Sequence, residues 1–205
     1  MRFQTILADP PWSYGDKLRK MKTAGGGAEQ HYPCLSLTQI AALSSRFVDH
    51  KIDRSISLTI AGHRIADDAH LWLWITNPFL VNEPWIDIVR AWDFEPKTLV
   101  TWVKGRLASG ATQSQPKGAR LVPHLTQGHY TRGCTEHLIL ATRGKAKALV
   151  QAHNVPNVFI APRTRHSEKP EQSYALIERV SPGPRLELFA RKPREGWIVW
   201  GNEVA

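Results

Sequence analysis

The stretch QTILADPPWSYGDK, residues 4–17, decides the fold that we expect for this chain. Its apolar run stops at an acid followed by two prolines, and proline ends strands because it has no N–H to donate to a ladder. We therefore predict a buried strand over residues 3–8 and a rigid loop over residues 9–12 at its tip. In open α/β sheets, ligands bind at the carboxyl ends of strands. The loop is thus a candidate site, and its simpler interpretation is a strand-ending turn with a structural tryptophan.

The rest of the chain alternates strand patterns with helix patterns. Such alternation is typical of a mostly parallel sheet with helices packed on it, so we predict an α/β fold. A length of 205 residues suits a single domain, 1–205. One helix is expected over 169–182, with Pro170 in its first turn. The other predicted strands are 69–76, 97–104, 136–144, 185–190 and 196–202, and the other predicted helices are 35–49 and 80–94.

Two long segments, 13–34 and 105–133, are rich in Gly, Pro, Ser and basic residues, and we predict both as loops. Loops of this length are uncommon in a compact domain and often serve as lids or binding loops. Their positive charge suits a phosphate backbone, and the alternative is a pair of solvated linkers. The basic residues in and beside these segments include Lys17, Arg19, Lys20, Lys22, Lys104, Arg106, Lys117, Arg120 and Arg132.

Composition and net charge indicate which kind of molecule the protein binds. The chain has 27 Lys and Arg against 18 Asp and Glu, a formal net charge of +9 and a pI near 9.8. This balance favours nucleic acid as the partner, although a basic protein with a solvated surface would also fit.

The cysteines and histidines argue against disulfides and metals. Cys34 and Cys134 form no CxxC pair, which is typical of a reduced, cytoplasmic setting. The histidines show no HxH or HxxxH spacing, so we expect no metal site. The sequence also shows no signal-peptide pattern and no apolar run long enough to span a bilayer, so we expect no membrane association.

The residue types in the first loop suit one chemical task. An exocyclic amine of a base is a poor nucleophile, because its lone pair is delocalised into the ring. The Asp9 carboxylate and the Pro10 carbonyl can accept its two N–H bonds, and the second proline, Pro11, has no N–H to compete. The ring of Trp12 can stack on a base taken out of its helix.

The chain resembles the MT-A family of N6-adenine methyltransferases, of the METTL and IME types. ADPPW matches the signature of that family, and further pieces agree in order along nearly the whole chain. These pieces are HYPCLS, LWLWIT, TWVKG, GHYTRGCTEHLILATRG, RHSEKPEQSYALIERVSPGPRLELFAR and GWIVWGNE.

The resemblance implies a Rossmann-like fold and S-adenosyl-L-methionine as methyl donor. It also implies a permuted order, with the catalytic motif first and part of the cofactor pocket last. RLELFAR would then be the strand that delivers the cofactor-binding turn, including Phe189, while Arg191 matches a family arginine at the cofactor ribose. WIVWGNE would be the next strand, after which Asn202 and Glu203 bind ribose hydroxyls.

Three more residues take roles from the resemblance. Lys169 matches a family lysine in the active site, close to cofactor and substrate, as Asp9 is. Tyr32 corresponds to a tyrosine near the target base, where it either stacks or anchors the loop. Glu136 either lines the pocket or has a structural place in its strand.

Some positions depart from the family pattern. Ala190 stands where a glycine is common. The RKPRE turn is short, so the ribose-contacting histidine of the family has no clear counterpart, and Lys192 and Arg194 are only nearby candidates.

The reaction implied is transfer of a methyl group to N6 of adenine in a nucleic acid. The compact chain favours DNA as substrate, with RNA as the first alternative and a non-catalytic nucleic-acid-binding paralogue as the second. A homodimer, a heterodimer with a paralogue and a monomer all stay open.

Overall fold

The computed structural model describes residues 1–12, 34–49, 51–109, 119–126, 130–163 and 168–204. Their main feature is a nine-stranded sheet in the order β11-β10-β1-β5-β8-β6-β7, with β4 added on β5 and β9 on β6. The strands are β1 Phe3–Ala8, β4 Thr59–Ile60, β5 His63–Ile75, β6 Glu95–Ser109, β7 Ala119–Pro123, β8 Thr135–Arg143, β9 Val158–Ala161, β10 Arg185–Leu188 and β11 Trp197–Trp200. The helices are α1 Leu37–Ala41, α2 Asn77–Asn82, α3 Trp85–Ala91, α4 Glu171–Val180 and the 3-10 helix Ala146–Leu149, and a separate ribbon pairs β2 Phe47–Val48 with β3 Lys51–Ile52.

Most strands of the sheet run in the same direction, so their carboxyl ends lie at one edge of the sheet. β11, β10, β1 and β5 are mutually parallel, and β6 and β9 run the same way because each pairing on β8 is antiparallel. Within this sheet, the described strands that run the opposite way are β8, β7 and β4. The expected α/β fold with a mostly parallel sheet is confirmed, and β1 lies between β10 and β5, inside the parallel part.

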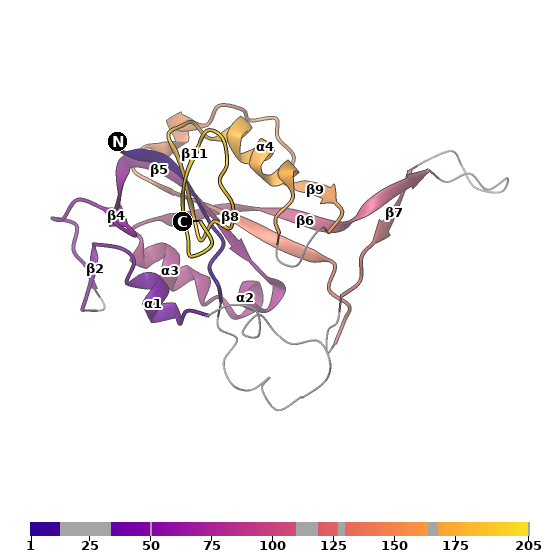
Figure 1. Cartoon of the computed structure of the whole chain (residues 1–205), viewed down its shortest axis with the longest axis horizontal. Coiled ribbons are helices and arrows are strands. Elements are labelled where there is room, and N and C mark those ends of the chain that lie inside the picture. Colours follow the sequence, from indigo (N-terminus) through magenta and orange to yellow (C-terminus); the bar gives the residue numbers. More distant parts are fainter. Residues whose placement is uncertain (13–33, 50, 110–118, 127–129, 164–167, 205) are drawn as a thin grey trace.

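The two faces of the sheet carry separate cores (Figure 1). Side chains alternate along a strand, so Ile6 and Ala8 join the core under α1, α2 and α3, while Leu7 joins the core under α4. α4 lies on one side of the sheet and the other three α-helices lie on the opposite side. Asp9 follows the parity of Leu7, which directs the candidate site to the face that α4 covers.

Local signals account for most helix ends. The Ser36 hydroxyl caps α1 by accepting from the Gln39 N–H, and the Ser36 N–H donates in return to Gln39 Oε1, which completes a capping box. The predicted helix over 35–49 nevertheless stops at Ala41. The predicted helix over 169–182 is confirmed as α4, with Pro170 at its N-cap.

The predicted helix over 80–94 is wrong, because it is two helices. Glu83 adopts a left-handed conformation with φ 58° and ends α2, and Pro84 then starts α3. Asn77 and Pro78, which lie between the predicted strand over 69–76 and this predicted helix, form the first turn of α2.

The second predicted loop is also wrong in part. β6 continues to Ser109 and pairs with β7 as an antiparallel hairpin, which projects beyond the rest of the sheet (Figure 1). We call residues 104–109 and 119–124 the arm. At its root, a Cβ on Gly105 would lie 2.7 Å from the Val122 carbonyl oxygen, so only glycine permits this close pairing. Residues 13–33 and 110–118 lie outside the described residues.

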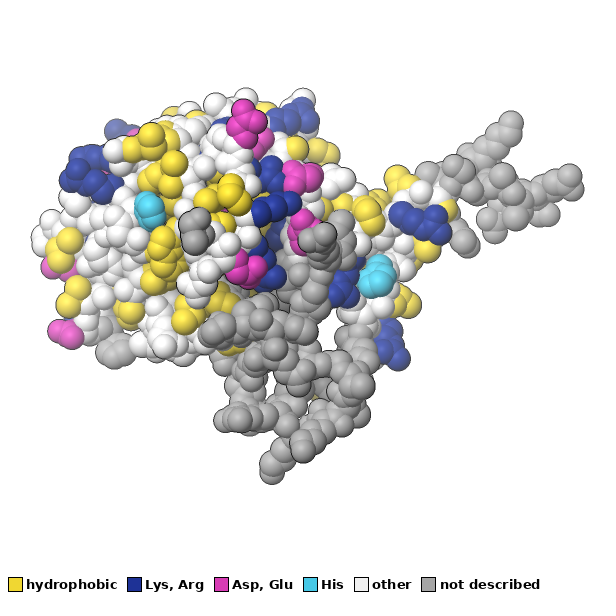
Figure 2. Space-filling view, in the orientation of Figure 1, with side chains coloured by type: hydrophobic (Ala, Val, Ile, Leu, Met, Phe, Trp, Pro, Cys, Tyr) yellow, Lys and Arg dark blue, Asp and Glu magenta, His cyan; other side chains and the backbone are white. Residues whose placement is uncertain are grey.

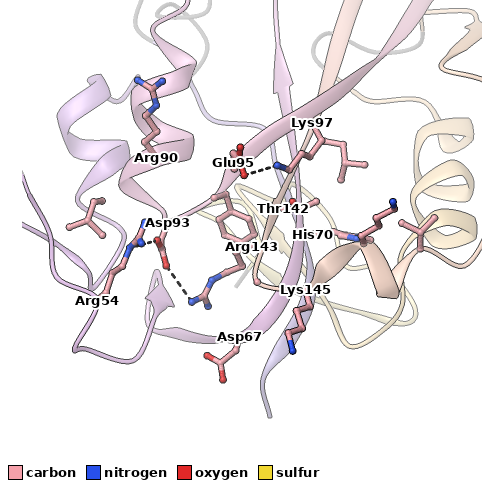
Figure 3. Close-up of a pocket in the computed structure, with 16 residues that line it drawn as sticks. Arg54, Asp67, His70, Arg90, Asp93, Glu95, Lys97, Thr142, Arg143 and Lys145 are labelled. Atoms are coloured by element: carbon pink, nitrogen blue, oxygen red, sulfur yellow. Dashed lines mark hydrogen bonds and ion pairs between the residues drawn. The ribbon is translucent and has the colours of Figure 1, made fainter.

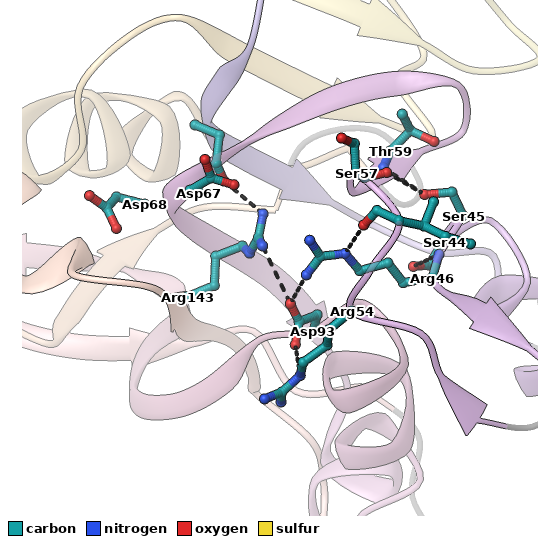
Figure 4. Close-up of polar contacts among 12 residues, drawn as sticks. Ser44, Ser45, Arg46, Arg54, Ser57, Thr59, Asp67, Asp68, Asp93 and Arg143 are labelled. Atoms are coloured by element: carbon teal, nitrogen blue, oxygen red, sulfur yellow. Dashed lines mark hydrogen bonds and ion pairs between the residues drawn. The ribbon is translucent and has the colours of Figure 1, made fainter.

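A cluster of arginines on one carboxylate joins α3 to the β-rich segment before it (Figure 4). Asp93 follows the C-cap of α3 with φ 60°, and its carboxylate pairs with Arg46, with Arg54 at 3.2 Å and with Arg143 at 3.3 Å. Arg46 and Arg143 each also donate to a backbone carbonyl. The Asp93, Arg46 and Arg143 side chains are nearly buried, so the carboxylate compensates charge that water does not reach.

Replacing Asp93 is therefore expected to be costly. Asp93→Ala leaves buried guanidinium groups without a carboxylate, and the free energy of unfolding should fall by about 3 kcal/mol. Urea denaturation measures this loss. Glu95→Ala is the control, since Glu95 pairs with Lys97 in an exposed position where an ion pair contributes at most about 1 kcal/mol. Equal losses in the two variants would contradict a structural role for the cluster.

No helix in the described residues is long and apolar enough to cross a membrane.

Candidate active site

The loop at the tip of β1 is held by its own backbone. The Trp12 N–H donates to the Pro10 carbonyl at 2.8 Å, and the Leu35 N–H donates to the Pro11 carbonyl at 2.9 Å. Two prolines fix their φ angles as well. The loop is therefore a rigid mount for Asp9, whose carboxylate lies at the carboxyl edge of the sheet.

Trp12 is part of the core and does not line either cavity described below. Its side chain is only 5% exposed, its indole N–H donates to the Trp74 carbonyl at 3.2 Å, and its ring lies 4.8 Å from that of Phe79. A ring buried to this extent has no free face on which a base could stack, so the structure does not support the expected stacking role. The simpler interpretation, a structural tryptophan that anchors the loop, fits the contacts.

Charged side chains alternate in sign across the site. Lys169 Nζ lies 2.6 Å from Asp9 Oδ2 and 3.6 Å from Glu136 Oε2, and the other Glu136 oxygen accepts from Lys104 Nζ at 2.5 Å. The ammonium groups also lie over indole rings, Lys169 at 5.3 Å from Trp74 and Lys104 at 5.2 Å from Trp102. We call Asp9, Lys169, Glu136 and Lys104 the charge row.

The pKa shifts follow from this row. Burial alone would lower the pKa of Lys169, but the Asp9 and Glu136 carboxylates outweigh it and raise that pKa. Burial would likewise raise the pKa of Glu136, but Lys169 and Lys104 outweigh it and lower that pKa. Lys169 is therefore a cation and Glu136 an anion at neutral pH, in spite of their burial.

Two cavities adjoin at Asp9. One, of about 280 Å³, is lined by Lys169, Tyr174 and Glu187, and the other, of about 350 Å³, by Trp200, Gly201 and Asn202. Both are also lined by Asp9, Phe189, Arg191 and Glu203.

The turn after β10 shapes the space between the two cavities. Phe189 has φ 64°, and a Cβ on Gly201 would lie 2.3 Å from the Ala190 carbonyl oxygen, so the two strand ends meet closely. The rings of Phe189 and Trp200 lie 5.6 Å apart and form an apolar wall. Arg191 Nε lies 3.9 Å from Glu203 Oε1. An apolar wall beside carboxylates and an amide fits S-adenosyl-L-methionine, which joins a sulfonium cation to a ribose and an aromatic base.

Most of the predicted site residues converge here. Asp9, Lys169, Phe189, Arg191, Asn202 and Glu203 line the adjoining cavities, and Glu136 contacts Lys169. Tyr32 lies outside the described residues. Of the two nearby candidates, Lys192 also lines the first cavity and pairs with Glu168, while Arg194 pairs with Glu171.

Three functional candidates escaped sequence reasoning. Lys104 was noted only as a loop charge, yet it holds Glu136. Tyr174 donates to Glu187 at 2.8 Å, and burial raises the pKa of both groups. An acid inside the apolar run RLELFA was the one available signal for Glu187.

A larger cavity, of about 1010 Å³, lies at the opposite edge of the sheet (Figure 3). It is lined by Arg143, His70 and Lys145, near the start of β5 and the end of β8. His70 is fully buried and hydrogen-bonded to Ser181 and the Ala146 carbonyl, which gives it a structural role. The charge row lies at the carboxyl edge of the sheet, beside the two smaller cavities. The volume of a cavity therefore does not identify the active site. No three His, Cys, Asp or Glu side chains in the described ranges cluster as metal ligands would.

The fold and the site define an S-adenosyl-L-methionine-dependent methyltransferase of the α/β type. The family model MT-A70 matches residues 3–203, so the chain belongs to the MT-A70 family, and the resemblance noted in the sequence is confirmed. It is 30% identical over 207 residues to the type II methyltransferase M.MunI of a Mycoplasma species, covering 99% of this chain and 78% of that protein.

It is also 26% identical over 206 residues to the human N(6)-adenosine-methyltransferase catalytic subunit METTL3, covering 99% of this chain but 28% of that protein. The MT-A70-like N(6)-adenosine-methyltransferase of Drosophila melanogaster gives 26% identity and 27% coverage of its length. The chain thus spans about a quarter of these two relatives and most of M.MunI.

The charge row predicts a pH-dependent loss of stability. At pH 7, Glu136→Gln should lower the free energy of unfolding by about 3 kcal/mol, because two ammonium groups lose a carboxylate. Glu136 has its pKa lowered by folding, so its contribution is present above its ordinary value of 4.5 and disappears as pH falls through the lower folded value.

Urea unfolding at pH 7 and at decreasing pH below 4.5 tests this expectation. The difference between wild type and Glu136→Gln should shrink toward acid. Glu195→Gln, at an exposed position, should match wild type throughout. A difference that stays constant with pH would contradict the ionised state of Glu136.

Proposed function

We propose that this protein transfers the methyl group of S-adenosyl-L-methionine to N6 of adenine in DNA. The observation that carries the proposal is the Asp9 carboxylate, which lies at a rigid strand tip, is paired on one side by Lys169 and lines both cavities. When bound, the cofactor supplies an electrophilic methyl group. The chain's own residues bind and orient the amine that receives it.

The Asp9 carboxylate and the Pro10 carbonyl accept hydrogen bonds from the two N–H groups of the adenine amine. Lys169 lies against one Asp9 oxygen, Oδ2, which leaves the other oxygen to accept the first N–H. The Pro10 carbonyl accepts from Trp12 with one lone pair and has a second for the other N–H. These acceptors draw the nitrogen lone pair out of ring delocalisation. Asp9 need not be a strong base, since the proton can leave to water after transfer, and most of the acceleration comes from positioning and electrostatics.

Glu136 and Lys104 position Lys169. Without Glu136, the Lys169 ammonium would have only the Asp9 carboxylate to compensate its charge, and it would neutralise more of the negative charge that the amine needs. Phe189, Arg191, Asn202 and Glu203 bind the cofactor in the adjoining cavity. All these groups come from the described part of this chain.

DNA is the preferred substrate because the chain spans most of M.MunI, a type II methyltransferase, and about a quarter of METTL3. An RNA N6-adenosine methyltransferase is the alternative. We propose a cytoplasmic location, because Cys34 and Cys134 form no CxxC pair and the sequence shows no disulfide pattern.

Asp9→Ala should abolish methylation and leave cofactor binding nearly unchanged. The reaction contains methyl-labelled S-adenosyl-L-methionine and single- or double-stranded DNA or RNA, with nucleosides separated after digestion. We expect N6-methyladenine with wild type in DNA, and none with Asp9→Ala. Asp67→Ala is the control, because Asp67 is exposed at the opposite edge of the sheet. Full activity of Asp9→Ala would overturn the mechanism, and product in RNA alone would select the alternative substrate.

Asn202→Ala should weaken binding of S-adenosylhomocysteine about tenfold, since one hydrogen bond contributes about 1.4 kcal/mol. Isothermal titration calorimetry measures the dissociation constant. Asn82→Ala, at the end of α2, should leave it unchanged. Unaltered affinity in Asn202→Ala would place the cofactor ribose elsewhere.

A further inference from the structure

The arm begins inside the active site. Lys104, whose ammonium holds Glu136, is its first residue, and its carbonyl accepts from the His124 N–H at 2.7 Å. Beyond this point β6 leaves β8 and pairs with β7 instead. The position of the arm is thus fixed relative to the charge row by backbone hydrogen bonds.

One face of the arm continues the face that carries the chemistry. Trp102 belongs to the core under α4, together with Leu7 and Trp74. Because side chains alternate along a strand, Lys104 and Arg106 lie on the same face as Trp102. Arg106 pairs in register with Val122, one strand across. A nucleic acid that presents an adenine to Asp9 would therefore pass over this face.

The end of β9 adds a second arginine. β9 runs parallel to β6 with Ala161 opposite Lys104, so the residues after it follow the arm for a short distance. Arg106, His124 and Arg163 line one pocket of about 200 Å³ at the root of the arm. Figure 2 shows Lys, Arg and His side chains along the arm.

The pocket is positive, and no carboxylate of the described residues compensates its charges. Among the described residues that line it there is no Asp or Glu. Arg106 and Arg163 are exposed, and within the described ranges neither guanidinium forms an ion pair. By contrast, Lys169, Lys192 and Arg194 nearby all pair with carboxylates. One guanidinium group can donate two parallel N–H bonds to the oxygens of a phosphate. Two arginines that line one pocket therefore suit a phosphate as ligand.

We propose that Arg106, His124 and Arg163 form a phosphate subsite that holds one backbone phosphate of the DNA strand carrying the target adenine. The inference rests on the proposed function, which supplies the DNA. The subsite fixes the strand beside the charge row, so that the adenine reaches Asp9 from a defined direction. It contributes to DNA binding and has no part in the methyl transfer.

The test is the double variant Arg106→Ala/Arg163→Ala, compared with Arg64→Ala/Arg90→Ala. The control removes the same charge from exposed positions on β5 and α3. Binding of a fluorescein-labelled pool of random-sequence duplex DNA is followed by anisotropy at several salt concentrations. Methylation of the same pool is measured for each protein, so that KM and kcat are separated.

We expect the double variant to raise Kd and KM at least tenfold, with kcat unchanged. The slope of log K against log salt should fall by about 1, as for the loss of one phosphate contact. Arg106→Lys/Arg163→Lys should restore part of the affinity. Equal affinity and salt slope in the double variant and its control would overturn the subsite. Absence of methylation by wild type would overturn the proposed function, and DNA affinity would then still decide the subsite by itself.

Discussion

A carboxylate and an ammonium ion lie side by side in a partly buried position, Asp9 at the tip of β1 and Lys169 before α4. Removing each ion from water costs on the order of several kcal/mol, so the pair persists only where further partners offset that cost. Glu136 and Lys104 extend it into a row of alternating sign, and indole faces lie beneath both ammonium groups. The surrounding strands and helices must therefore hold all four charged groups in contact.

The central strand serves both cores at once. Ile6 and Ala8 pack toward α1–α3, while Leu7 packs toward α4 and sets the side on which Asp9 emerges. A shift of one residue in the pairing of β1 would turn Asp9 toward the other core. The prolines that follow end the strand at the one position where the carboxylate faces the cavities. Packing and chemistry are therefore fixed by the same register.

Sequence reasoning succeeded where the signal was local. The strand at residues 3–8, the helix that begins after Pro170 and the final strands each have a clear apolar pattern with a terminating residue. It failed where one residue overrides a pattern, as Glu83 does by adopting a left-handed conformation inside an apolar helical repeat. The arm was missed because Gly, Ser and Pro outweighed the alternation of Arg106 and Leu107. The contact between Lys104 and Glu136 joins separate strands, and no spacing in the sequence encodes it.

The site draws on both ends of the chain, and this has a consequence for the order of events during synthesis. β1 emerges from the ribosome before the strands it pairs with, and its second neighbour, β10, emerges some 180 residues later. Until then β1 has hydrogen-bonding groups on one side that only water or another chain can satisfy. The turn after β11, which we propose to bind the cofactor ribose, comes later still. Catalytic competence therefore arrives with the last strands, and an incomplete nascent chain cannot methylate the nucleic acid around it.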